Sequence, residues 1–214
     1  MLHERHFTPA DRMPTVEGMR ILLVGATGKL GTAVHQELVE RKHDVVTVSR
    51  TGGDLQYDVT DPAQVAELYQ TVGQVDAVAS AAGSVPWRPL AELTVEDYQA
   101  AVTGKVLSQV ALVKEGLSFV TGSFTLITGV LAREPVVTGA AAALANGAVE
   151  AFVRAAAIEI APLRINAVSP TVFTEALDDY GDFFPGMKPV PLADVAQAYV
   201  RSIEGRQTGQ VYEL

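Results

Sequence analysis

Short apolar runs alternate with segments of helical character along most of the chain. From Met19 onward, the β-rich runs "RILLVGA", "DVVTVS" and "VDAVASAAG" are separated by segments with helical periodicity at about 28–41 and 62–71. Because strands and helices alternate, this half is predicted to form a βαβαβ unit.

The second half repeats the alternation. A long helix is predicted around 94–118 and another at 138–160, with the strand "GSFTLITG" between them. The strand "LRINAVSP", a helix near 191–204 and the strand "GQVYEL" follow. The pattern predicts a three-layer α/β Rossmann fold, a doubly wound parallel sheet of about seven strands with helices on both faces. Ligands of such sheets bind at the carboxyl ends of the strands.

One long irregular segment interrupts the pattern at 169–190, "SPTVFTEALDDYGDFFPGMKPV", after a predicted strand. Long loops on the ligand side of a sheet commonly act as lids over substrates. The alternative is a surface excursion that packs its own Phe173, Phe183 and Phe184.

Length and charge narrow the class of protein. With 214 residues and 48% apolar composition, the chain is expected to form one globular domain over 19–214, preceded by an extension over 1–18. The net charge of −9 argues against nucleic acid and anionic membrane as partners. The start of the chain has no apolar signal-peptide region, and no long uninterrupted apolar run follows, so a cytoplasmic location is expected.

The inventory of reactive side chains excludes several chemistries. The chain has no Cys, so disulfides and thiolate catalysis are excluded. All four His residues precede the predicted second half, which supports neither a His-based triad nor a His metal site. No metal is therefore expected.

A glycine-rich turn follows the first predicted strand. Gly25, Gly28 and Gly31 form G-x-x-G-x-x-G in "VGATGKLG", which also contains Thr27 and Leu30. Glycines allow a tight turn and close backbone approach, and the N-terminus of the following helix offers free N–H groups to a diphosphate. The strand–turn–helix context predicts an NAD(P)-binding domain.

The residues after the second strand indicate which dinucleotide binds. An acidic side chain there would hold the ribose hydroxyls of NAD, whereas a cation accommodates the 2′-phosphate of NADP. The strand ends at Ser49 and Arg50, and Lys29 in the glycine loop is a second cation within reach. NADP(H) is therefore the preferred cofactor, and Asp54 leaves NAD(H) as an alternative.

Taken together, these motifs resemble the short-chain dehydrogenase/reductase family from Met19 to Leu214. "GATGKLG" resembles its cofactor loop, "YDVTD" its adenine-binding step, "SAAG" its Asn-Asn-Ala-Gly motif and "LRINAVSPTVFT" the segment that borders nicotinamide. The resemblance implies further cofactor contacts at Asp58, Val59, Ala81, Ala82, Gly83, Pro170, Val172 and Thr174.

The same resemblance implies altered catalytic residues. Family enzymes use a Ser, a Tyr and a Lys one helical turn later, with an Asn on the preceding long helix. Aligning "ANGAVEAFVRAAAIEI" with the family's catalytic helix places Asn146 at the Lys and Ala142 at the Tyr, so the usual acid is missing. The Ser position falls at Thr128 or Gly129; Thr128 would keep a hydroxyl, or be an ordinary strand residue.

A lysine on the predicted helix around 94–118 is a candidate to replace the missing family Lys. In "TGKVLSQVALV", Lys105 takes the place of the family's Asn, so Lys and Asn are exchanged between the two helices. Lys105 would then enter the same pocket from the other side. In the competing interpretation Lys105 points to solvent and Asn146 caps or spaces a helix contact. Among the tyrosines, only Tyr180 in the 169–190 segment is placed to replace the lost Tyr.

Three functions follow from these residues. The first is an NADP(H)-dependent oxidoreductase acting on a small carbonyl or alcohol substrate, with Thr128 and Lys105 polarising the carbonyl and water or substrate supplying the proton. The second is a regulatory or scaffold protein that binds NADP(H) without turnover, and the third is non-redox chemistry such as isomerisation with the cofactor bound. By resemblance, the helices near 94–118 and 138–160 would also pair in a homodimer or homotetramer.

Overall fold

The computed structural model describes residues 18–214, so the predicted N-terminal extension lies outside the described residues. Seven strands make one sheet: β1 (Arg20–Val24), β2 (Asp44–Ser49), β3 (Leu55–Gln56), β4 (Val75–Ser80), β5 (Val120–Ile127), β6 (Arg164–Ser169) and β7 (Val211–Glu213). The longer helices are α1 (Lys29–Glu40), α2 (Pro62–Val72), α3 (Val95–Ala101), α4 (Ser108–Gly116), α5 (Ala140–Glu159) and α7 (Leu192–Glu204).

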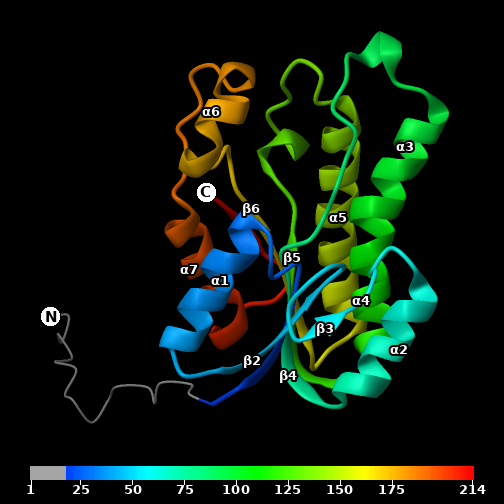
Figure 1. Ribbon diagram of the computed structural model, residues 1–214, viewed down its shortest axis with the longest axis vertical. Helices are drawn as coiled ribbons and strands as arrows, with labels where there is room; N and C mark the ends of the chain where they lie inside the picture. The colour runs from blue at the N-terminus through cyan, green and yellow to red at the C-terminus, as the bar shows by residue number, and fades with distance from the viewer. Residues whose placement is uncertain (1–17) are drawn as a thin grey trace, which may run out of the picture.

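The sheet is parallel throughout, in the order β3-β2-β1-β4-β5-β6-β7. Helices α1 and α7 cover one face, and α2, α4 and α5 cover the other, which gives three layers (Figure 1). The predicted doubly wound Rossmann fold is confirmed. The direction of winding reverses between β1 and β4, and this is the point where sheets of this kind bind ligands.

Local sequence explains where several elements begin and end. Strand β1, "RILLV", is almost entirely apolar because helices cover both of its faces. Helix α2 begins with Asp61, whose side chain accepts a hydrogen bond from the Ala63 N–H, and it has a proline in its first turn. Helix α3 begins with a capping box formed by Thr94 and Asp97.

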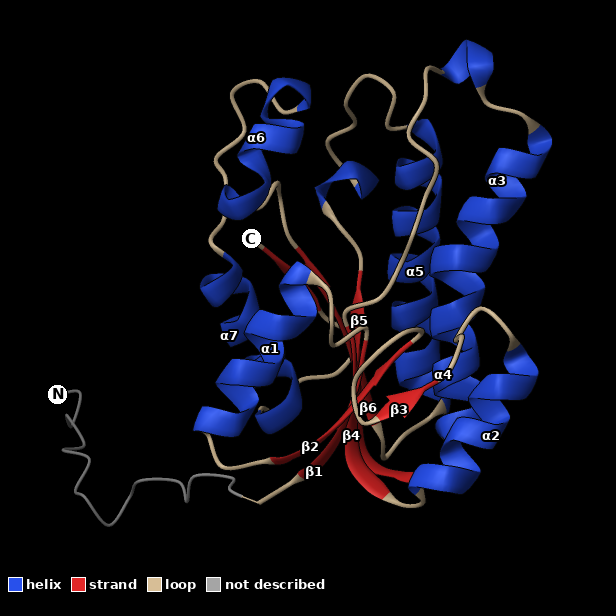
Figure 2. Cartoon of the chain, viewed as in Figure 1, coloured by secondary structure: helices blue, strands red, loops and turns tan. Residues whose placement is uncertain are grey.

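Two segments differ from the sequence prediction. The long helix predicted around 94–118 is continuous but contains a π-helical stretch, η3 (Val102–Leu107), between α3 and α4. The 169–190 segment is not wholly irregular, because it holds η5 (Thr174–Ala176), α6 (Leu177–Tyr180) and η6 (Gly181–Phe183). Figure 2 shows these short helices beyond the ends of the strands, on the same side as the loops that follow β4 and β5. Two further short turns are η2 (Leu90–Glu92) and η4 (Val130–Ala132).

Helix α5 is the one helix within residues 18–214 that is long and apolar enough to cross a membrane. It packs against β6, η4 and η3 in the fold, and core helices of soluble proteins have the same length and composition. Its outer face leaves Leu144 and Ile158 exposed, as the preceding long helix leaves Leu107. Pairing of these helices between copies stays a prediction.

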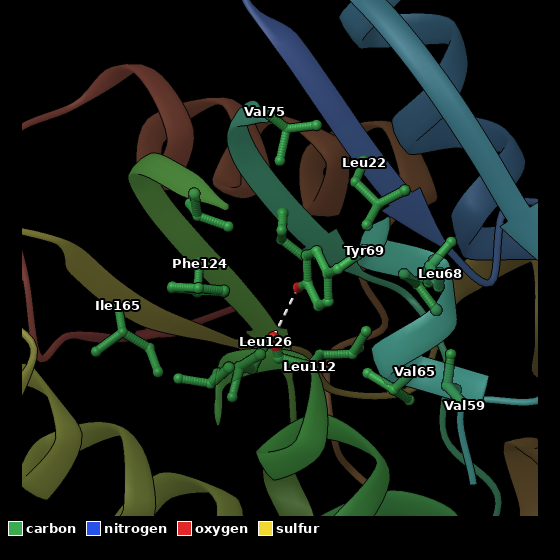
Figure 3. Close-up of a cluster of buried hydrophobic side chains, with 14 of the residues drawn as sticks. Leu22, Val59, Val65, Leu68, Tyr69, Val75, Leu112, Phe124, Leu126 and Ile165 are labelled. Atoms are coloured by element: carbon green, nitrogen blue, oxygen red, sulfur yellow. Dashed lines mark hydrogen bonds between the residues drawn. The ribbon is translucent and has the colours of Figure 1, made fainter. Parts of the chain in front are cut away.

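Tyr69 anchors the core between the sheet and helices α2 and α4 (Figure 3). Its ring is fully buried, and its hydroxyl donates a 2.6 Å hydrogen bond to the Leu112 carbonyl oxygen. We expect Tyr69→Phe to lower the free energy of unfolding by about 1–2 kcal/mol, because a buried acceptor loses its partner. Urea denaturation measures this change. Tyr57→Phe, which removes the exposed contact of Tyr57 with Thr71, should have a much smaller effect, and equal losses would contradict the assignment.

Candidate functional site

Two adjoining cavities lie at the carboxyl ends of the strands. The smaller, of about 320 Å³, lies beside the β1–α1 turn and the end of β2. The larger, of about 640 Å³, extends from the same turn to α5 and the 169–190 segment. Gly28 and residues 81–84 line both cavities. An elongated ligand can therefore occupy both at once.

The β1–α1 turn has the geometry of a diphosphate site. Gly25 has a φ of 82°, and a Cβ there would lie 2.8 Å from the Ala82 nitrogen, so the position requires glycine. A Cβ at Gly31 would collide with the Gly25 carbonyl oxygen. Gly28 precedes α1 and provides no side-chain cap, which leaves the first N–H groups of the helix for an anion.

Most of the predicted cofactor residues line the smaller cavity: Gly25, Thr27, Gly28, Ser49, Arg50, Asp58, Val59, Ala81, Ala82 and Gly83. Arg50 is exposed at the rim, and the neighbouring Ser49 hydroxyl bonds to both the N–H and the carbonyl of Gly52. The Asp58 carboxylate accepts hydrogen bonds from the backbone and side chain of Thr60, which lower the pKa of Asp58. Leu30 and Pro170 line the larger cavity.

The structure corrects the prediction that Lys29 joins Arg50 at a 2′-phosphate. Lys29 lines the larger cavity, whereas Arg50 lines the smaller. The Lys29 Nζ donates to the Glu175 carbonyl at 3.2 Å and pairs with the Asp179 carboxylate at 3.3 Å. Lys29 is the first residue of α1, and the 169–190 segment provides its partners. It therefore ties this segment to the helix.

Asp54 is also placed differently from its predicted alternative role at an NAD ribose. Its carboxylate accepts hydrogen bonds from the N–H and the hydroxyl of Thr47, at 2.9 and 2.7 Å. These bonds fix the turn between β2 and β3, and Asp54 does not line the smaller cavity. At the end of β2, the charged side chain that lines the smaller cavity is thus the cation Arg50 and not Asp54.

The segment after β6 alternates its side chains, which corrects two further predictions. Thr171 and Phe173 line the larger cavity, while the Val172 side chain is buried on the opposite side. The Val172 carbonyl accepts from the Val190 N–H, and the Thr174 N–H donates to the Val190 carbonyl. Val172 and Thr174 therefore hold the two ends of the 169–190 segment together and do not line either cavity.

The three predicted catalytic residues meet in the wall of the larger cavity. Lys105 comes from η3, Thr128 follows β5 and Asn146 lies in α5. The Lys105 Nζ is 3.4 Å from the Thr128 carbonyl oxygen, and burial lowers the pKa of Lys105 to about 8. The alternative in which Lys105 points to solvent is wrong. Ala142 lines the same cavity one helical turn before Asn146.

Asn146 neither caps a helix nor has a full set of partners. It lies in the interior of α5, and its buried Oδ1 has no hydrogen-bond partner among residues 18–214. Its Nδ2 lies close over Gly129, 3.1 Å from where a Cβ of that glycine would be. The amide is thus confined beside the end of β5, with an acceptor that a ligand hydroxyl would satisfy.

The Thr128 hydroxyl is directed away from the cavity. It is 3.2 Å from both the Asn146 carbonyl oxygen and a Glu150 carboxylate oxygen. Both are acceptors, so the hydroxyl proton is held by α5 and does not polarise a ligand in this arrangement. Among the predicted trio, Lys105 is the residue that brings an ionisable proton to the cavity wall.

A buried carboxylate that the sequence analysis missed organises this end of the sheet. Glu150 accepts hydrogen bonds at one oxygen from Thr128, Arg133 and Ser169, and the Arg133 contact is an ion pair of 2.7 Å. Arg133 also donates to the Ser169 hydroxyl and pairs with Glu213. The network joins the ends of β5, β6 and β7 to α5. The position of Glu150 one helical turn after Asn146 was the signal that could have found it.

Gln109 was missed as well. Its side-chain amide accepts from the Ile127 N–H at 2.8 Å and donates to the Ile127 carbonyl at 2.9 Å. It also donates to the carbonyl of Lys105, which lies one turn earlier. Gln109 therefore fixes the end of β5 against the π-helical turn, and so fixes Lys105 relative to Thr128.

Aromatic side chains from two segments meet at the larger cavity. Trp87, from the loop after β4, packs edge-on against Tyr180 and Phe183, with ring centroids 6.2 and 5.6 Å apart, and lies more nearly parallel to Phe184. The 169–190 segment thus packs across the cavity onto Trp87 and not only onto its own rings. Tyr180 lines the cavity, as its predicted placement requires.

Comparison with known proteins places this architecture in a family. The sequence matches the family model described as enoyl-(acyl carrier protein) reductase over residues 15–192. It is 27% identical over 191 residues to the short-chain dehydrogenase/reductase ATR9 of Stachybotrys chlorohalonatus, covering 74% of this chain and 75% of that protein.

Solved structures give the same result. The protein lin1944 from Listeria innocua is 46% identical, with a TM-score of 0.89 over 92% of this chain and 100% of that chain. A small-chain dehydrogenase solved in complex with NADPH is 26% identical, with a TM-score of 0.82 over 92% of this chain and 97% of that chain. The chain belongs to the short-chain dehydrogenase/reductase family of oxidoreductases.

Proposed function

We propose that the protein is an NADP(H)-dependent oxidoreductase that reduces a small carbonyl compound, or oxidises the corresponding alcohol, with Lys105 as the proton donor. The observation that carries this proposal is the position of Lys105. Its ammonium group lies in the larger cavity, next to the cavity that fits a dinucleotide, and burial lowers the pKa of Lys105 to about 8. A side chain that loses its proton near neutral pH is suited to acid–base chemistry.

The residues of the smaller cavity fit NADP(H). The N-terminus of α1 would hold the diphosphate, because its N–H groups have no side-chain cap. Arg50 at the rim would hold the 2′-phosphate. A related dehydrogenase has been solved with NADPH, which supports the same cofactor here. Asn146, with its unpartnered buried oxygen, would accept a hydrogen bond from a ribose hydroxyl.

Several residues of this chain then have separate roles in the reaction. The nicotinamide supplies a hydride to the carbonyl carbon when the cofactor is bound. Lys105 donates a hydrogen bond to the carbonyl oxygen and transfers a proton to it as the alcohol forms. In the reverse direction the neutral amine accepts that proton. Gln109 and the π-helical turn hold Lys105 in place, and the Glu150 network holds the strand end beside it.

Binding and turnover test this function together. Titrating the protein with NADPH and NADH, with the fluorescence of its single tryptophan as the signal, measures the two affinities. A panel of carbonyl and alcohol substrates then tests turnover. NADPH consumption with one of them supports the oxidoreductase. NADPH binding without turnover across the panel would favour a regulatory or scaffold protein, in agreement with the alanine at position 142.

The choice between cofactors gives a sharper prediction. We expect Arg50→Ala to weaken NADPH binding by roughly 10- to 100-fold, because it removes a charged hydrogen bond to the 2′-phosphate, and to leave NADH binding unchanged. Titration of both cofactors measures the two effects. Lys29→Ala is the matched control, because Lys29 faces the larger cavity and should not distinguish the cofactors. A selective loss of NADPH in Lys29→Ala, and none in Arg50→Ala, would contradict the assignment.

A further inference from the structure

Unpartnered polar atoms gather at the larger cavity. Within residues 18–214, six buried side-chain nitrogen or oxygen atoms have no hydrogen-bond partner in the protein. Three of them belong to residues that line the larger cavity, namely the Trp87 Nε1, the Asn146 Oδ1 and the Thr171 Oγ1. Buried polar groups in native proteins are nearly always paired, so unpaired groups around a cavity indicate that a ligand or water satisfies them.

Trp87 identifies the ligand atom most directly. The Thr171 hydroxyl both donates and accepts, so it can be satisfied in several ways, and the Asn146 Oδ1 accepts from any donor, a ribose hydroxyl of the cofactor included. The indole N–H only donates, and its proton is not lost in the physiological range. A ligand that replaces water beside Trp87 must therefore present an acceptor atom, or it leaves the N–H unsatisfied.

Packing fixes the indole in its place. Phe184 lies against it with a centroid distance of 6.4 Å and an angle of 29°, while Tyr180 and Phe183 meet it edge-on. Its other contacts are with the cluster that contains Val130, Leu131 and Ala142. Because rings confine it on several sides, the N–H has a fixed direction. The surrounding apolar wall suits a ligand with an apolar body.

We propose that Trp87 is a specificity-determining residue, whose indole N–H donates a hydrogen bond to an oxygen acceptor on an apolar substrate in the larger cavity. The inference rests on the proposed function, since it names the class of compound that this cavity takes. Lys105 and Trp87 are then two donors of the cavity wall that can only donate while Lys105 is charged, whereas the hydroxyls of Thr171 and Tyr180 both donate and accept. Alkenes and hydrocarbons of the same shape are excluded because they leave Trp87 without a partner.

Nuclear magnetic resonance tests the contact without requiring turnover. Trp87 is the only tryptophan, so the ¹⁵N-labelled protein has one indole N–H signal. The probes are acetophenone and α-methylstyrene, which has a methylene group in place of the carbonyl oxygen, each added to the NADP⁺-saturated protein. We expect acetophenone to move the indole proton signal downfield. We expect no downfield shift with α-methylstyrene. Equal shifts from the two compounds, or no shift from acetophenone, would overturn the inference.

Replacing the indole itself provides the kinetic test. Growth on β-(3-benzothienyl)alanine substitutes the single tryptophan by an analogue of the same shape that has sulfur in place of N–H. We expect kcat/KM for acetophenone to fall at least tenfold, mostly through KM, while NADPH affinity measured by calorimetry stays the same. An unchanged kcat/KM would also overturn the inference. Failure of the unsubstituted protein to bind NADPH would instead count against the proposed function, so the two failures are distinguishable.

Discussion

Lys105→Met will reduce kcat/KM for carbonyl reduction by about 10²–10⁴-fold, the contribution usually attributed to a positioned acid. Methionine keeps the length of the stem that packs close to Gly83 and removes the proposed proton donor. Steady-state consumption of NADPH measures the change. Lys114→Met is the matched control, because Lys114 lies on α4, next along the same long helix, and is exposed. Equal effects of the two substitutions would disprove the role of Lys105.

The pH dependence of kcat/KM is expected to follow the protonation of Lys105. Reduction needs the ammonium form, so kcat/KM for reduction falls as pH rises through the pKa of Lys105, about 8. Oxidation needs the neutral amine, so its kcat/KM rises over the same interval. Lys105→Arg keeps the charge but does not release a proton in this range, so it removes the transition near pH 8 in both directions. A transition that persists in Lys105→Arg would belong to another group.

The free energy of unfolding shows whether Lys105→Met has lost only its ionisable group or has misfolded. Burial lowers the pKa of Lys105 in the folded state below that of the unfolded chain, so the charged form is destabilising. The unfolded chain binds the extra proton between about pH 8 and the ordinary lysine value, and the wild-type protein gains stability as pH rises through that window. Lys105→Met should therefore be more stable than wild type near pH 7, and it should lack this gain.

Glu150→Ala will lower the free energy of unfolding by about 2–3 kcal/mol. Loss of one partner from a buried ion pair costs about 3–5 kcal/mol, and the smaller value is expected because the Arg133 side chain is 29% exposed. The substitution also leaves the Thr128 and Ser169 hydroxyls without their acceptor. Urea denaturation followed by circular dichroism measures the difference.

Two variants of α5 make this second prediction specific. Glu150→Gln keeps an acceptor for the hydroxyls but removes the charge pair with Arg133. Its free energy of unfolding should therefore fall less than that of Glu150→Ala. Glu159→Ala changes an exposed glutamate at the end of the same helix and should stay within about 0.5 kcal/mol of wild type. If Glu150→Ala behaves like Glu159→Ala, the network does not stabilise the fold.

Local sequence patterns were sufficient to predict the fold and most residues that line the smaller cavity. The alternation of apolar runs and helical segments predicted the parallel sheet, because strands buried on both faces must be continuously apolar. The turn at Gly25 was predictable because a positive φ and a close approach to Ala82 require glycine. The placement of Arg50 followed from its position at the end of a strand.

Predictions from sequence position alone were wrong where they depended on the direction in which a side chain points. Lys29 was assigned to the 2′-phosphate because it lies in the glycine loop, yet it pairs with Asp179. Val172 was assigned to the cofactor, yet the extended chain turns its side chain away and presents Thr171 and Phe173. A difference of one residue reverses the face in an extended segment, and no local pattern fixed that register.

The sequence by itself therefore determined the order of elements, the glycine turn and the family resemblance, all of which depend on residues close together in the chain. The tertiary structure alone decided what surrounds Lys105: the Glu150 network from α5, Arg133 and β6, the Gln109 clamp on β5 and the aromatic wall at Trp87. These contacts join residues far apart in sequence. Burial of Lys105, which lowers its pKa, exists only when several elements enclose it, because desolvation is a property of the assembled site and not of any segment.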